Sequence, residues 1–502
     1  MKKHASDNIR SYDICIIGGG INGCGIAREL SAKGYQVFLA EKNDISSGTS
    51  SWSTKLIHGG LRYLEYYEFR LVREALRERE ILMQMAPHLI HPLRFILPHL
   101  PSMRPKWLLR LGLFLYDNLG KRRFLKGSSS VNFNTDETGA ILRSDLKYGF
   151  EYSDCFVDDN RLTLANALAA KDYGAEIKPR CEVTDVAPNG QDGWQVTTEK
   201  GTIYAKIVIN AAGPWVDQLR SLTGRKANQR SIRLVRGSHI LTKRLFNHDK
   251  AYIFQNSDSR ILFAIPYLDD FTLLGTTDVD HEGAPDKPEI SDDEITYICR
   301  EVSAYLKQPV TPEDVIATYS GVRPLYDDGA EDAKSATRDY VLKFEDGLAG
   351  DWLNIFGGKL TTYRQLALSV AKLIESRMAA PSAKGAGTKP LPGGDIKGAD
   401  FQAFLKQLGA DFPEIEAKQL KRLAMAYGTN IYAILGTPDK PLDQGLDFGA
   451  GLRLAEVDYL IAHEWAETAE DILWRRSKLG YFANDEMVEN LNRYLSSHPA
   501  IS

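Results

Sequence analysis

Hydrophobic positions in the first 40 residues follow two periods in turn. Residues 14–17 are continuously apolar, which predicts a strand buried on both faces of a sheet. Residues 21–30 repeat at helical spacing, with Ile26, Ala27 and Leu30 on one face. A second apolar run follows at residues 35–40. This order of strand, helix and strand predicts an α/β fold with a parallel sheet.

A glycine-rich turn joins the first predicted strand to the helix. Its glycines fit G-x-G-x-x-G, and an acid ends the second strand about 20 residues later. Such glycines let the backbone approach a pyrophosphate at a helix N-terminus, and the acid can accept hydrogen bonds from a ribose. An adenine dinucleotide is therefore predicted. The residues expected to hold it are Gly18, Gly20, Ile21, Asn22, Gly23, Glu41 and Lys42.

The later pattern divides the chain into domains. Short alternating runs between 230 and 320 predict an antiparallel sheet inserted between pieces of the α/β domain. A polar stretch at 381–394 predicts a linker, and 400–495 has helical periodicity. We predict a discontinuous dinucleotide-binding domain (1–80, 145–215 and 320–380), a substrate-binding or cap domain (81–144 and 216–319) and a C-terminal helical domain (395–502).

Composition excludes several classes of protein. A chain of 502 residues with 43% hydrophobic residues can bury more than one core, and its net charge of −4 argues against a nucleic-acid partner. Five cysteines without zinc spacing predict a reducing compartment and no metal site. No run reaches the ~18 apolar residues that span a bilayer, so we expect an intracellular protein with at most peripheral membrane contact.

Three further segments suit a dinucleotide that carries a flavin. In the first, Thr49, Ser50, Ser51 and Lys55 can line the pyrophosphate and the flavin edge, although a capped helix start also accounts for the serines. In the second, a strand at 207–210 ends in small residues that include Ala211 and Gly213. In the third, a strand ends in Gly357 and Gly358 before a helix whose first amides can stabilise reduced flavin. Ordinary strand-to-helix turns are the alternative for these two.

The order of the motifs resembles that of the aerobic, FAD-dependent sn-glycerol-3-phosphate dehydrogenases of bacteria. The resemblance runs from residue 12 to 364. It is carried by IIGGGING at 16–23, STKLIHGGLRYLE at 53–65, FEYSDC at 150–155, RGSHI at 236–240, GTTD at 275–278, YSGVRPL at 319–325, TRDY at 337–340 and FGGKLTTYR at 356–364. HEW at 463–465 and LWRR at 473–476 extend it. One departure is Trp52, a bulky residue inside the serine-rich loop.

The resemblance implies a fold, a cofactor and a reaction. The fold is an FAD-binding Rossmann-like domain with an antiparallel-sheet substrate domain, in a D-amino-acid-oxidase-like arrangement, and a C-terminal all-helical domain. The reaction is oxidation of sn-glycerol 3-phosphate to dihydroxyacetone phosphate with non-covalent FAD, whose electrons pass to a membrane quinone. The cofactor residues that the resemblance adds are Leu56, His58, Gly59, Val183, Gly321, Lys359, Leu360 and Thr361.

Oxidation of a phosphorylated secondary alcohol needs cations for the phosphate and a proton acceptor for the hydroxyl. The family pattern puts Arg62, Tyr63, Arg323, Arg338 and Lys359 in the substrate pocket. We assign Arg62 and Arg338 to the phosphate, and Arg323 and Lys359 nearer the alcohol and the flavin. The candidate catalytic bases are His58 in the flavin loop and His239. We prefer His239, because it lies in the predicted substrate sheet.

A basic and aromatic stretch is the candidate for membrane contact. Residues 104–126 hold seven lysines and arginines against one aspartate, a net charge of +6, interleaved with Trp107, Phe114 and several leucines. This composition is typical of an interfacial helix attracted to anionic lipid. A core helix with a solvated basic face is the alternative. The family is peripheral on the inner face of the bacterial cytoplasmic membrane, and we expect the same location for this chain.

Two other functions remain open at this point. An oxidase would pass the electrons to oxygen, and neither a quinone site nor oxygen reactivity has a compact motif. A flavoprotein that serves as a membrane-docked interaction module would have no need of the pocket cations and both histidines. The oligomeric state is open as well, with a homodimer among the states considered.

Overall fold

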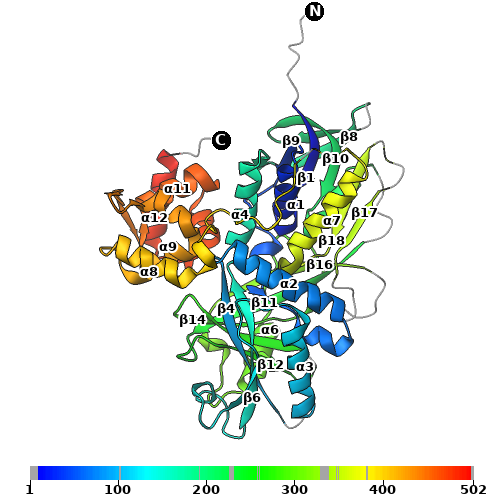
Figure 1. Ribbon diagram of the computed structural model, residues 1–502. Helices are drawn as coiled ribbons and strands as arrows, with labels where there is room; N and C mark the ends of the chain where they lie inside the picture. The colour runs from blue at the N-terminus through cyan, green and yellow to red at the C-terminus, as the bar shows by residue number, and fades with distance from the viewer. Residues whose placement is uncertain are drawn as a thin grey trace, which may run out of the picture.

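The computed structural model has three parts, two built on sheets and one mainly helical (Figure 1). It describes residues 10–100, 103–190, 193–224, 231–256, 258, 260–327, 339–345, 348, 350–379, 381 and 383–498. The chain crosses repeatedly between the two sheets, and residues beyond 400 form the separate helical part at the left of the figure.

Within the described residues, the first part is an eight-stranded sheet whose centre is parallel. Its order is β17 (Val341–Phe344), β18 (Asp351–Phe356), β10 (Gly201–Asn210), β1 (Ser11–Ile17), β2 (Val37–Ala40) and β7 (Glu176–Lys178), with β9 (Trp194–Thr198) on β10 and β8 (Val183–Pro188) on β9. Helices α1 (Ile21–Ala32), α4 (Asp159–Asp172) and α7 (Tyr363–Glu375) belong to this part, and the short α5 (Val216–Ser221) contacts β10 and β18.

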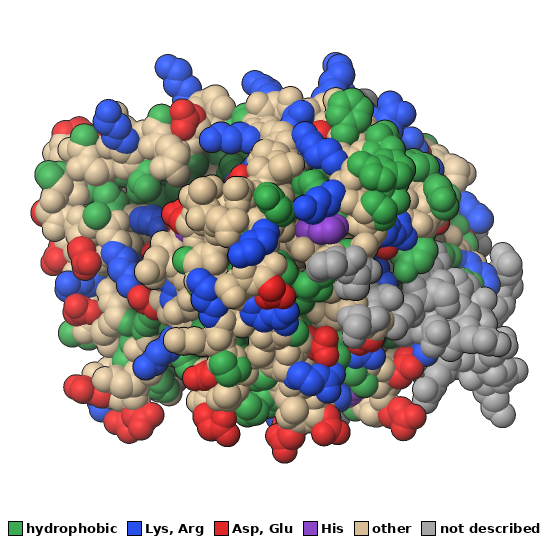
Figure 2. Space-filling view, turned by 90° about the horizontal axis from the view of Figure 1, so that it is seen from below, with side chains coloured by type: hydrophobic (Ala, Val, Ile, Leu, Met, Phe, Trp, Pro, Cys, Tyr) green, Lys and Arg blue, Asp and Glu red, His purple; other side chains and the backbone are tan. Residues whose placement is uncertain are grey.

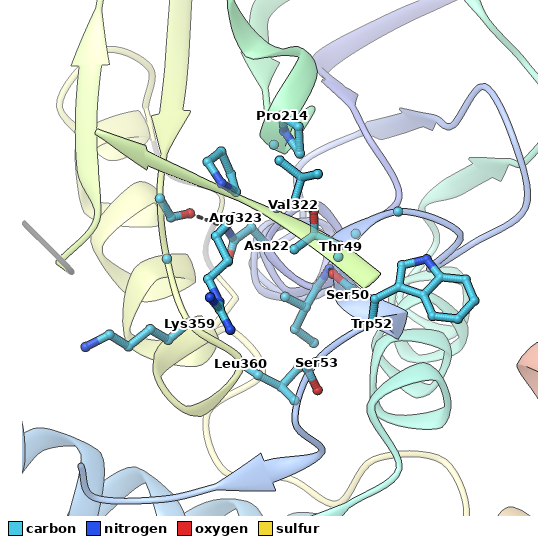
Figure 3. A pocket seen from close by; sticks show the side chains of 18 of the residues that line it. Asn22, Thr49, Ser50, Trp52, Ser53, Pro214, Val322, Arg323, Lys359 and Leu360 are labelled. Atoms are coloured by element: carbon cyan, nitrogen blue, oxygen red, sulfur yellow. Dashed lines mark hydrogen bonds between the residues drawn. The ribbon is translucent and has the colours of Figure 1, made fainter. Parts of the chain in front are cut away.

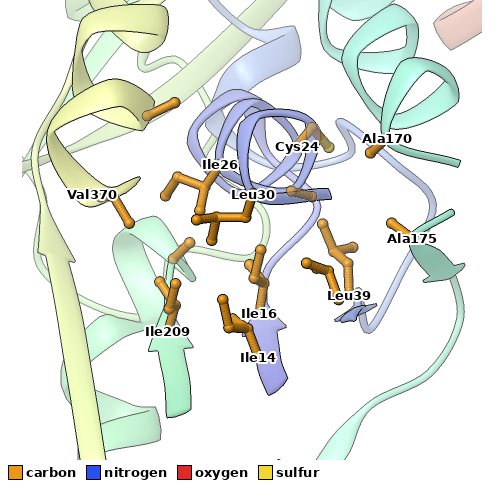
Figure 4. Packing of buried hydrophobic residues seen from close by; sticks show 14 of the residues in the cluster. Ile14, Ile16, Cys24, Ile26, Leu30, Leu39, Ala170, Ala175, Ile209 and Val370 are labelled. Atoms are coloured by element: carbon orange, nitrogen blue, oxygen red, sulfur yellow. The ribbon is translucent and has the colours of Figure 1, made fainter. Parts of the chain in front are cut away.

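Helix α1 lies between α4 and α7 over the parallel strands, as the end-on view of Figure 4 shows. Its apolar face, with Ile26 and Leu30, packs on Ile14, Ile16 and other buried side chains of the strands. Burying each such side chain stabilises the fold by about 1.5–3 kcal/mol. The strand–helix–strand unit that the hydrophobic pattern predicts is therefore present. Its buried core holds β1, which ends at Ile17, against α1.

The second part is a ten-stranded sheet among the described residues. Its order is β15 (Val279–Asp280), β11 (Ile232–Lys243), β14 (Phe271–Gly275), β13 (Ile261–Tyr267), β12 (Ala251–Gln255), β4 (Ile90–Pro98), β6 (Tyr148–Val157) and β3 (Leu56–Ile57), with β16 (Val315–Tyr326) on β11 and β5 (Ser129–Asn132) on β6. The pairs are antiparallel as predicted, except that β12 runs parallel to β4. Helices α2 (Phe69–Met85) and α3 (Lys106–Leu119) pack on one face, and α6 (Asp292–Ser303) on the other.

The sheet pairing moves some of the predicted domain boundaries. We assigned 1–80, 145–215 and 320–380 to the dinucleotide-binding domain, but β3, β6 and the end of β16 hydrogen-bond within the second sheet. Alternating burial predicts a strand from local sequence, whereas the partner of that strand can lie 100 residues away. The pattern therefore could not show which of the two sheets each strand joins.

The C-terminal part is built from short helices around its own core. They are α8 (Phe401–Asp411), α9 (Ala417–Tyr427), α10 (Ile431–Leu435), α11 (Leu454–Glu464), a π-helical turn (Asp471–Arg476) and α12 (Asp485–Ser497). Two small hairpins, β19–β20 (Gly436–Thr437 and Lys440–Pro441) and β21–β22 (Asp447–Gly449 and Leu452–Arg453), accompany them. In the described part of the chain, no helix combines the length and apolarity needed to cross a bilayer.

Candidate active site

A cavity of about 730 Å³ lies where the two sheets meet. Its wall combines the carboxyl ends of β1, β2 and β10 with residues of β11, β13 and β16 from the second sheet. Ligands of open α/β sheets bind beyond the carboxyl ends of the parallel strands. In Figure 3 the side chains of Asn22, Thr49, Ser50 and Arg323 gather at the centre of this cavity, with Lys359 and Trp52 on opposite sides. Among the described residues, no cluster of His, Cys, Asp and Glu could hold a metal ion.

The glycine turn forms one end of the cavity. Gly18 adopts φ +116°, a backbone conformation that side chains disfavour, and Gly20 caps the start of α1. A Cβ on Gly23 would lie 1.9 Å from the carbonyl oxygen of Gly18, so this glycine allows α1 to pack against the turn. Gly18, Gly20 and the first two helical residues, Ile21 and Asn22, line the cavity, and Gly23 does not.

This end of the cavity fits a dinucleotide. The Glu41 carboxylate accepts hydrogen bonds from the backbone N–H of Gly19 (2.6 Å) and of Asn43 (2.8 Å), and it faces the cavity. Its enclosure raises the pKa of the carboxyl group. Asn22 Oδ1 is buried and has no hydrogen-bond partner in the described part of the chain. Both are acceptors that suit the hydroxyl groups of a ribose or ribityl chain, and the N-terminus of α1 offers backbone N–H groups to a pyrophosphate, so the predicted FAD fits here.

The serine-rich loop has one face in the cavity and one in the protein. Ser50 Oγ accepts the N–H of Ile21 at 2.9 Å, and Thr49 Oγ1 donates to the carbonyl of Val322 at 2.7 Å. Both line the cavity, whereas Ser51 and Lys55 do not. We expected Lys55 at the pyrophosphate, but its ammonium group is buried 2.8 Å from the Asp159 carboxylate. A buried ammonium needs a carboxylate partner, and Lys55 therefore fixes the loop from behind.

Most of the other expected cofactor residues lie on the cavity wall. These are Lys42, Leu56, His58, Val183, Ala211, Gly213, Gly321, Gly358, Lys359, Leu360 and Thr361. Gly59 does not: its N–H donates to Tyr116 Oη at 2.8 Å, and a Cβ there would lie 2.4 Å from Leu76. Gly59 is thus required by packing against α2 and α3.

Cationic side chains form the other end of the cavity. Arg323 on β16 is held by the carboxylate of Asp278 and, at 3.1 Å, by Thr276 Oγ1. Lys359 Nζ lies 4.4 Å from the ring centre of Tyr63, a cation–π contact. Arg62 lines the cavity as well. Arg338, which we expected beside them, falls outside the described residues.

The two candidate bases are placed differently. His58 is half-buried on the cavity wall. His239 is almost fully buried, stacks on Tyr319 at 4.7 Å and does not line the cavity. Its Nε2 pairs with Thr54 Oγ1 at 3.0 Å, and Thr54 lies on the wall. Burial, with the charges of Arg323 and Lys55, keeps the pKa of His239 well below its ordinary value. The geometry therefore favours His58 over our preferred His239.

The sequence missed several residues of the wall. Thr276 and Asp278 belong to a motif that we quoted for the resemblance without a role. Residues 285–288 also line the cavity, and no sequence motif marked them as part of a site. Trp52, which we regarded as a departure, lines the cavity, and its ring lies tilted against that of Tyr319 with 5.7 Å between the ring centres. An apolar part of the wall is formed by Leu71, Ala75, Phe95, Tyr152, Ile253, Ile261 and Phe263. These side chains are typical of a core, so only the fold could assign them to the cavity.

Comparison with known protein families matches almost the whole chain. A family model described as FAD dependent oxidoreductase matches residues 13–364, and one described as the C-terminal domain of alpha-glycerophosphate oxidase matches residues 387–497. The first match covers most of the two parts built on sheets, and the second covers the helical C-terminal part.

Three individual proteins illustrate the similarity. The chain is 45% identical to glycerol-3-phosphate dehydrogenase of Pseudomonas aeruginosa, over 97% of this chain and 96% of that protein. It is 43% identical to D-erythritol 1-phosphate dehydrogenase of Brucella abortus, over 93% and 94%. It is 27% identical to the solved glycerol-3-phosphate dehydrogenase of Bacillus halodurans complexed with FAD, with a TM-score of 0.75 over 98% and 91%. This structure and the family model confirm the predicted fold class.

Proposed function

The chain belongs to the FAD dependent oxidoreductase family and, within it, to the glycerol-3-phosphate dehydrogenases, and on that premise we propose that it oxidises sn-glycerol 3-phosphate to dihydroxyacetone phosphate. FAD is its cofactor. The observation that carries the substrate proposal is the union of a dinucleotide cradle and a cationic end in one cavity. A substrate with a phosphate and a secondary alcohol uses both.

The cationic end suits a phosphate monoester. Arg62 lines the wall, and we retain Arg338 as the second phosphate ligand from the sequence, with Lys359 nearer the alcohol and the flavin. Guanidinium and ammonium groups form strong charge-assisted hydrogen bonds with phosphate oxygens. Arg323 is anchored by Asp278, so its guanidinium is held in place before substrate arrives. In our proposal it orients the alcohol end of the substrate.

The chemical step needs a proton acceptor and an electron acceptor in fixed positions. When bound, the flavin takes up the hydride that leaves C2 of the substrate. We propose that His58 accepts the C2 hydroxyl proton at its ring nitrogen, because it lies on the wall itself. Its backbone N–H donates to Thr361 Oγ1 at 3.3 Å, which ties the histidine loop to the start of the helix that follows β18. That tie keeps the base at one distance from the cofactor cradle.

We propose a membrane quinone as the electron acceptor. The apolar part of the cavity wall, which includes Phe95, Tyr152 and Ile253, belongs to the same core cluster as Leu113 and Tyr116 of α3. An apolar lining suits a quinone ring better than it suits a polar electron acceptor. It also connects the cavity with the helix that we expect to contact lipid.

An oxidase is the second candidate. Residues 387–497 match a model named for the C-terminal domain of alpha-glycerophosphate oxidase. An oxidase would pass the electrons to oxygen at the same flavin. The two candidates share the first half of the reaction and differ only in how the reduced flavin is reoxidised.

Anaerobic mixing with substrate tests this function. Glycerol 3-phosphate should bleach the flavin absorbance, and glycerol, which cannot use the cationic end, should not do so at the same concentration. D-erythritol 1-phosphate in place of glycerol 3-phosphate tests the alternative substrate named by the Brucella relative. Reoxidation of the bleached enzyme should be fast with a quinone analogue and slow with oxygen. Bleaching by neither phosphate would refute the proposal, and faster reoxidation by oxygen would favour the oxidase.

Helix α3 has the surface that a membrane contact needs. Trp107, Leu111 and Phe114 follow helical spacing on one face and are 68%, 47% and 56% exposed. Leu113 and Tyr116 on the opposite face are buried in the core of the second sheet. Figure 2, which views the molecule from below, shows hydrophobic side chains gathered beside basic ones on the side where α3 lies in Figure 1. The exposed face fits the interfacial helix, and the buried face fits the core helix, that we considered for this segment. We propose that the exposed face docks peripherally on anionic lipid.

Removing the apolar anchors should release the protein from vesicles. We expect the double variant Trp107→Ser, Phe114→Ser to bind anionic vesicles more weakly by about 3 kcal/mol, roughly a hundredfold, because each large apolar side chain contributes at least about 1.5 kcal/mol when buried. The matched control is Leu446→Ser, which changes a side chain 58% exposed on the C-terminal part. Vesicle flotation at low and high salt measures both. Equal flotation of the double variant and the control would exclude α3 as the docking surface.

A further inference from the structure

No described residue of the C-terminal part lies on the cavity wall, yet this part contacts the loop after Glu41 directly and the serine-rich loop through the start of α4. We propose that its segment 471–478 positions these loops, and that Arg476 is a positioning residue for FAD binding. The proposal rests on the cofactor and not on the proposed substrate.

The first contact is with Asp44, three residues after Glu41. Arg476 donates to both oxygens of the Asp44 carboxylate, at 2.7 and 2.8 Å, and Arg475 donates to one of them at 2.6 Å. The side chains of Asp44 and Arg476 are 2% and 1% exposed. Both arginines can face one carboxylate because residues 471–476 form a π-helical turn, a departure from regular helix that often marks a functional position.

Asp44 lies in the loop that presents Glu41 to the cavity. The backbone N–H of Ser46 donates to the carbonyl of Gly19 at 3.1 Å, and the N–H of Cys181 donates to the carbonyl of Glu41 at 2.8 Å. Ser46 adopts φ +68°, which is costly for a residue with a side chain. A loop with such a conformation needs outside support to keep it, and the two arginines supply that support.

A second contact lies next to Cys181, another residue of the cavity wall. Arg180, which precedes Cys181, pairs with Asp471 at 2.5 Å. Burial alone would raise the pKa of Asp471, but the amide of Glu467 and the surrounding arginines lower it to about 2. The Asp471 carboxylate is therefore ionised throughout the working range of pH and keeps its charge for the ion pair with Arg180.

A third contact reaches the serine-rich loop through the start of α4. Lys478, with φ +60°, donates from its buried ammonium group to Asn160 Oδ1 at the start of α4. The neighbouring Asp159 accepts from Ser53 Oγ at 2.7 Å and from Lys55 Nζ at 2.8 Å. One short segment of the C-terminal part therefore contacts the loop after Glu41 directly and the serine-rich loop through the start of α4.

These contacts predict faster loss of cofactor when the fork of Arg476 is removed. Arg476→Lys keeps the charge but cannot bond both oxygens of Asp44, and Asp44→Asn removes the acceptor charge. We expect the holoenzyme of either variant to release FAD on the order of tenfold faster, the effect typical of losing an outer-shell partner of a bound group. Release is measured as the rise of free-flavin fluorescence after dilution, well below the unfolding temperature. Hydrogen exchange of the holoenzyme should also rise in the peptide that covers residues 41–47.

Arg422→Lys is the matched control. Arg422 donates to both oxygens of Glu456 at 2.7 Å, a two-pronged, partly buried pair that lies wholly within the C-terminal part and touches no cofactor loop. It should lower the unfolding temperature as Arg476→Lys does, with FAD release and exchange at residues 41–47 close to those of the native protein. Equal FAD release from Arg476→Lys and Arg422→Lys would overturn the proposal, since the contact would then be only structural.

Discussion

Replacing His58 with asparagine is expected to slow flavin reduction by glycerol 3-phosphate about 10²–10⁴-fold, the range that a positioned general base contributes. His58 lies on the wall of the cavity in which we propose that the substrate binds. Asparagine fills a similar volume and can donate a hydrogen bond, but it cannot take a proton. Anaerobic stopped-flow measurement of flavin bleaching isolates this step from reoxidation. The native rate should also fall in acid as the imidazole becomes protonated, and the variant should lose that dependence.

His239→Asn is the control for this experiment. His239 stacks on Tyr319 and pairs with Thr54, so its loss should lower stability and weaken the wall around Thr54. Because burial keeps His239 neutral at working pH, its replacement should leave the acid limb of the rate profile unchanged. A rate loss in His239→Asn as large as in His58→Asn would contradict our assignment. The proton would then pass through Thr54 Oγ1 to His239 Nε2.

The features that the sequence predicted well are those built from neighbours in the chain. The glycine turn needs only residues 18–23, the strand before it and the helix after it. Glu41 then lies at the cavity because β2 is parallel to β1 and ends beside it. The dinucleotide cradle and the fold class therefore followed from the pattern of a short N-terminal segment together with the resemblance.

Other features depend on partners that are distant in sequence. Lys55 turns away from the cavity because Asp159, 104 residues later, accepts its ammonium group. Asp44 meets Arg476, 432 residues later. No local pattern indicates such pairs, and a lysine in a serine-rich loop is equally suited to a phosphate. The same reason explains why the predicted domain boundaries cut across the second sheet, since β6 and β16 pair with strands that are remote in the chain.

His239 shows a third kind of limit. Its position in the substrate sheet was predicted correctly, because β11 does belong to the second sheet. The burial of its ring could not be predicted, because the ring stacks on Tyr319 of β16, 80 residues later in the chain. Sequence placed the residue on the right element, and only packing decided whether it reaches the cavity wall.

Gly23→Ala is expected to cost about 3 kcal/mol or more of unfolding free energy, at the upper end for an overpacked site. The added Cβ would lie 1.9 Å from the carbonyl oxygen of Gly18, and both atoms belong to backbone on the two sides of one turn. No side chain can move aside to relieve the clash. The turn between β1 and α1 has to open, and the core under α1 opens with it. Urea unfolding of the holoenzyme at a fixed FAD concentration measures the loss.

Gly20→Ala separates this structural role from cofactor binding. Gly20 has φ −77°, which alanine adopts without strain, and its Cβ would meet only Ser50 Oγ at 3.1 Å while pointing to the cavity. The methyl group should obstruct FAD and leave the turn intact. Because a ligand stabilises by RT ln(1 + [L]/Kd), high FAD should restore the unfolding temperature of Gly20→Ala and leave most of the deficit of Gly23→Ala. Full recovery of both variants at high FAD would mean that Gly23 also acts through the cofactor and not through the packing of α1.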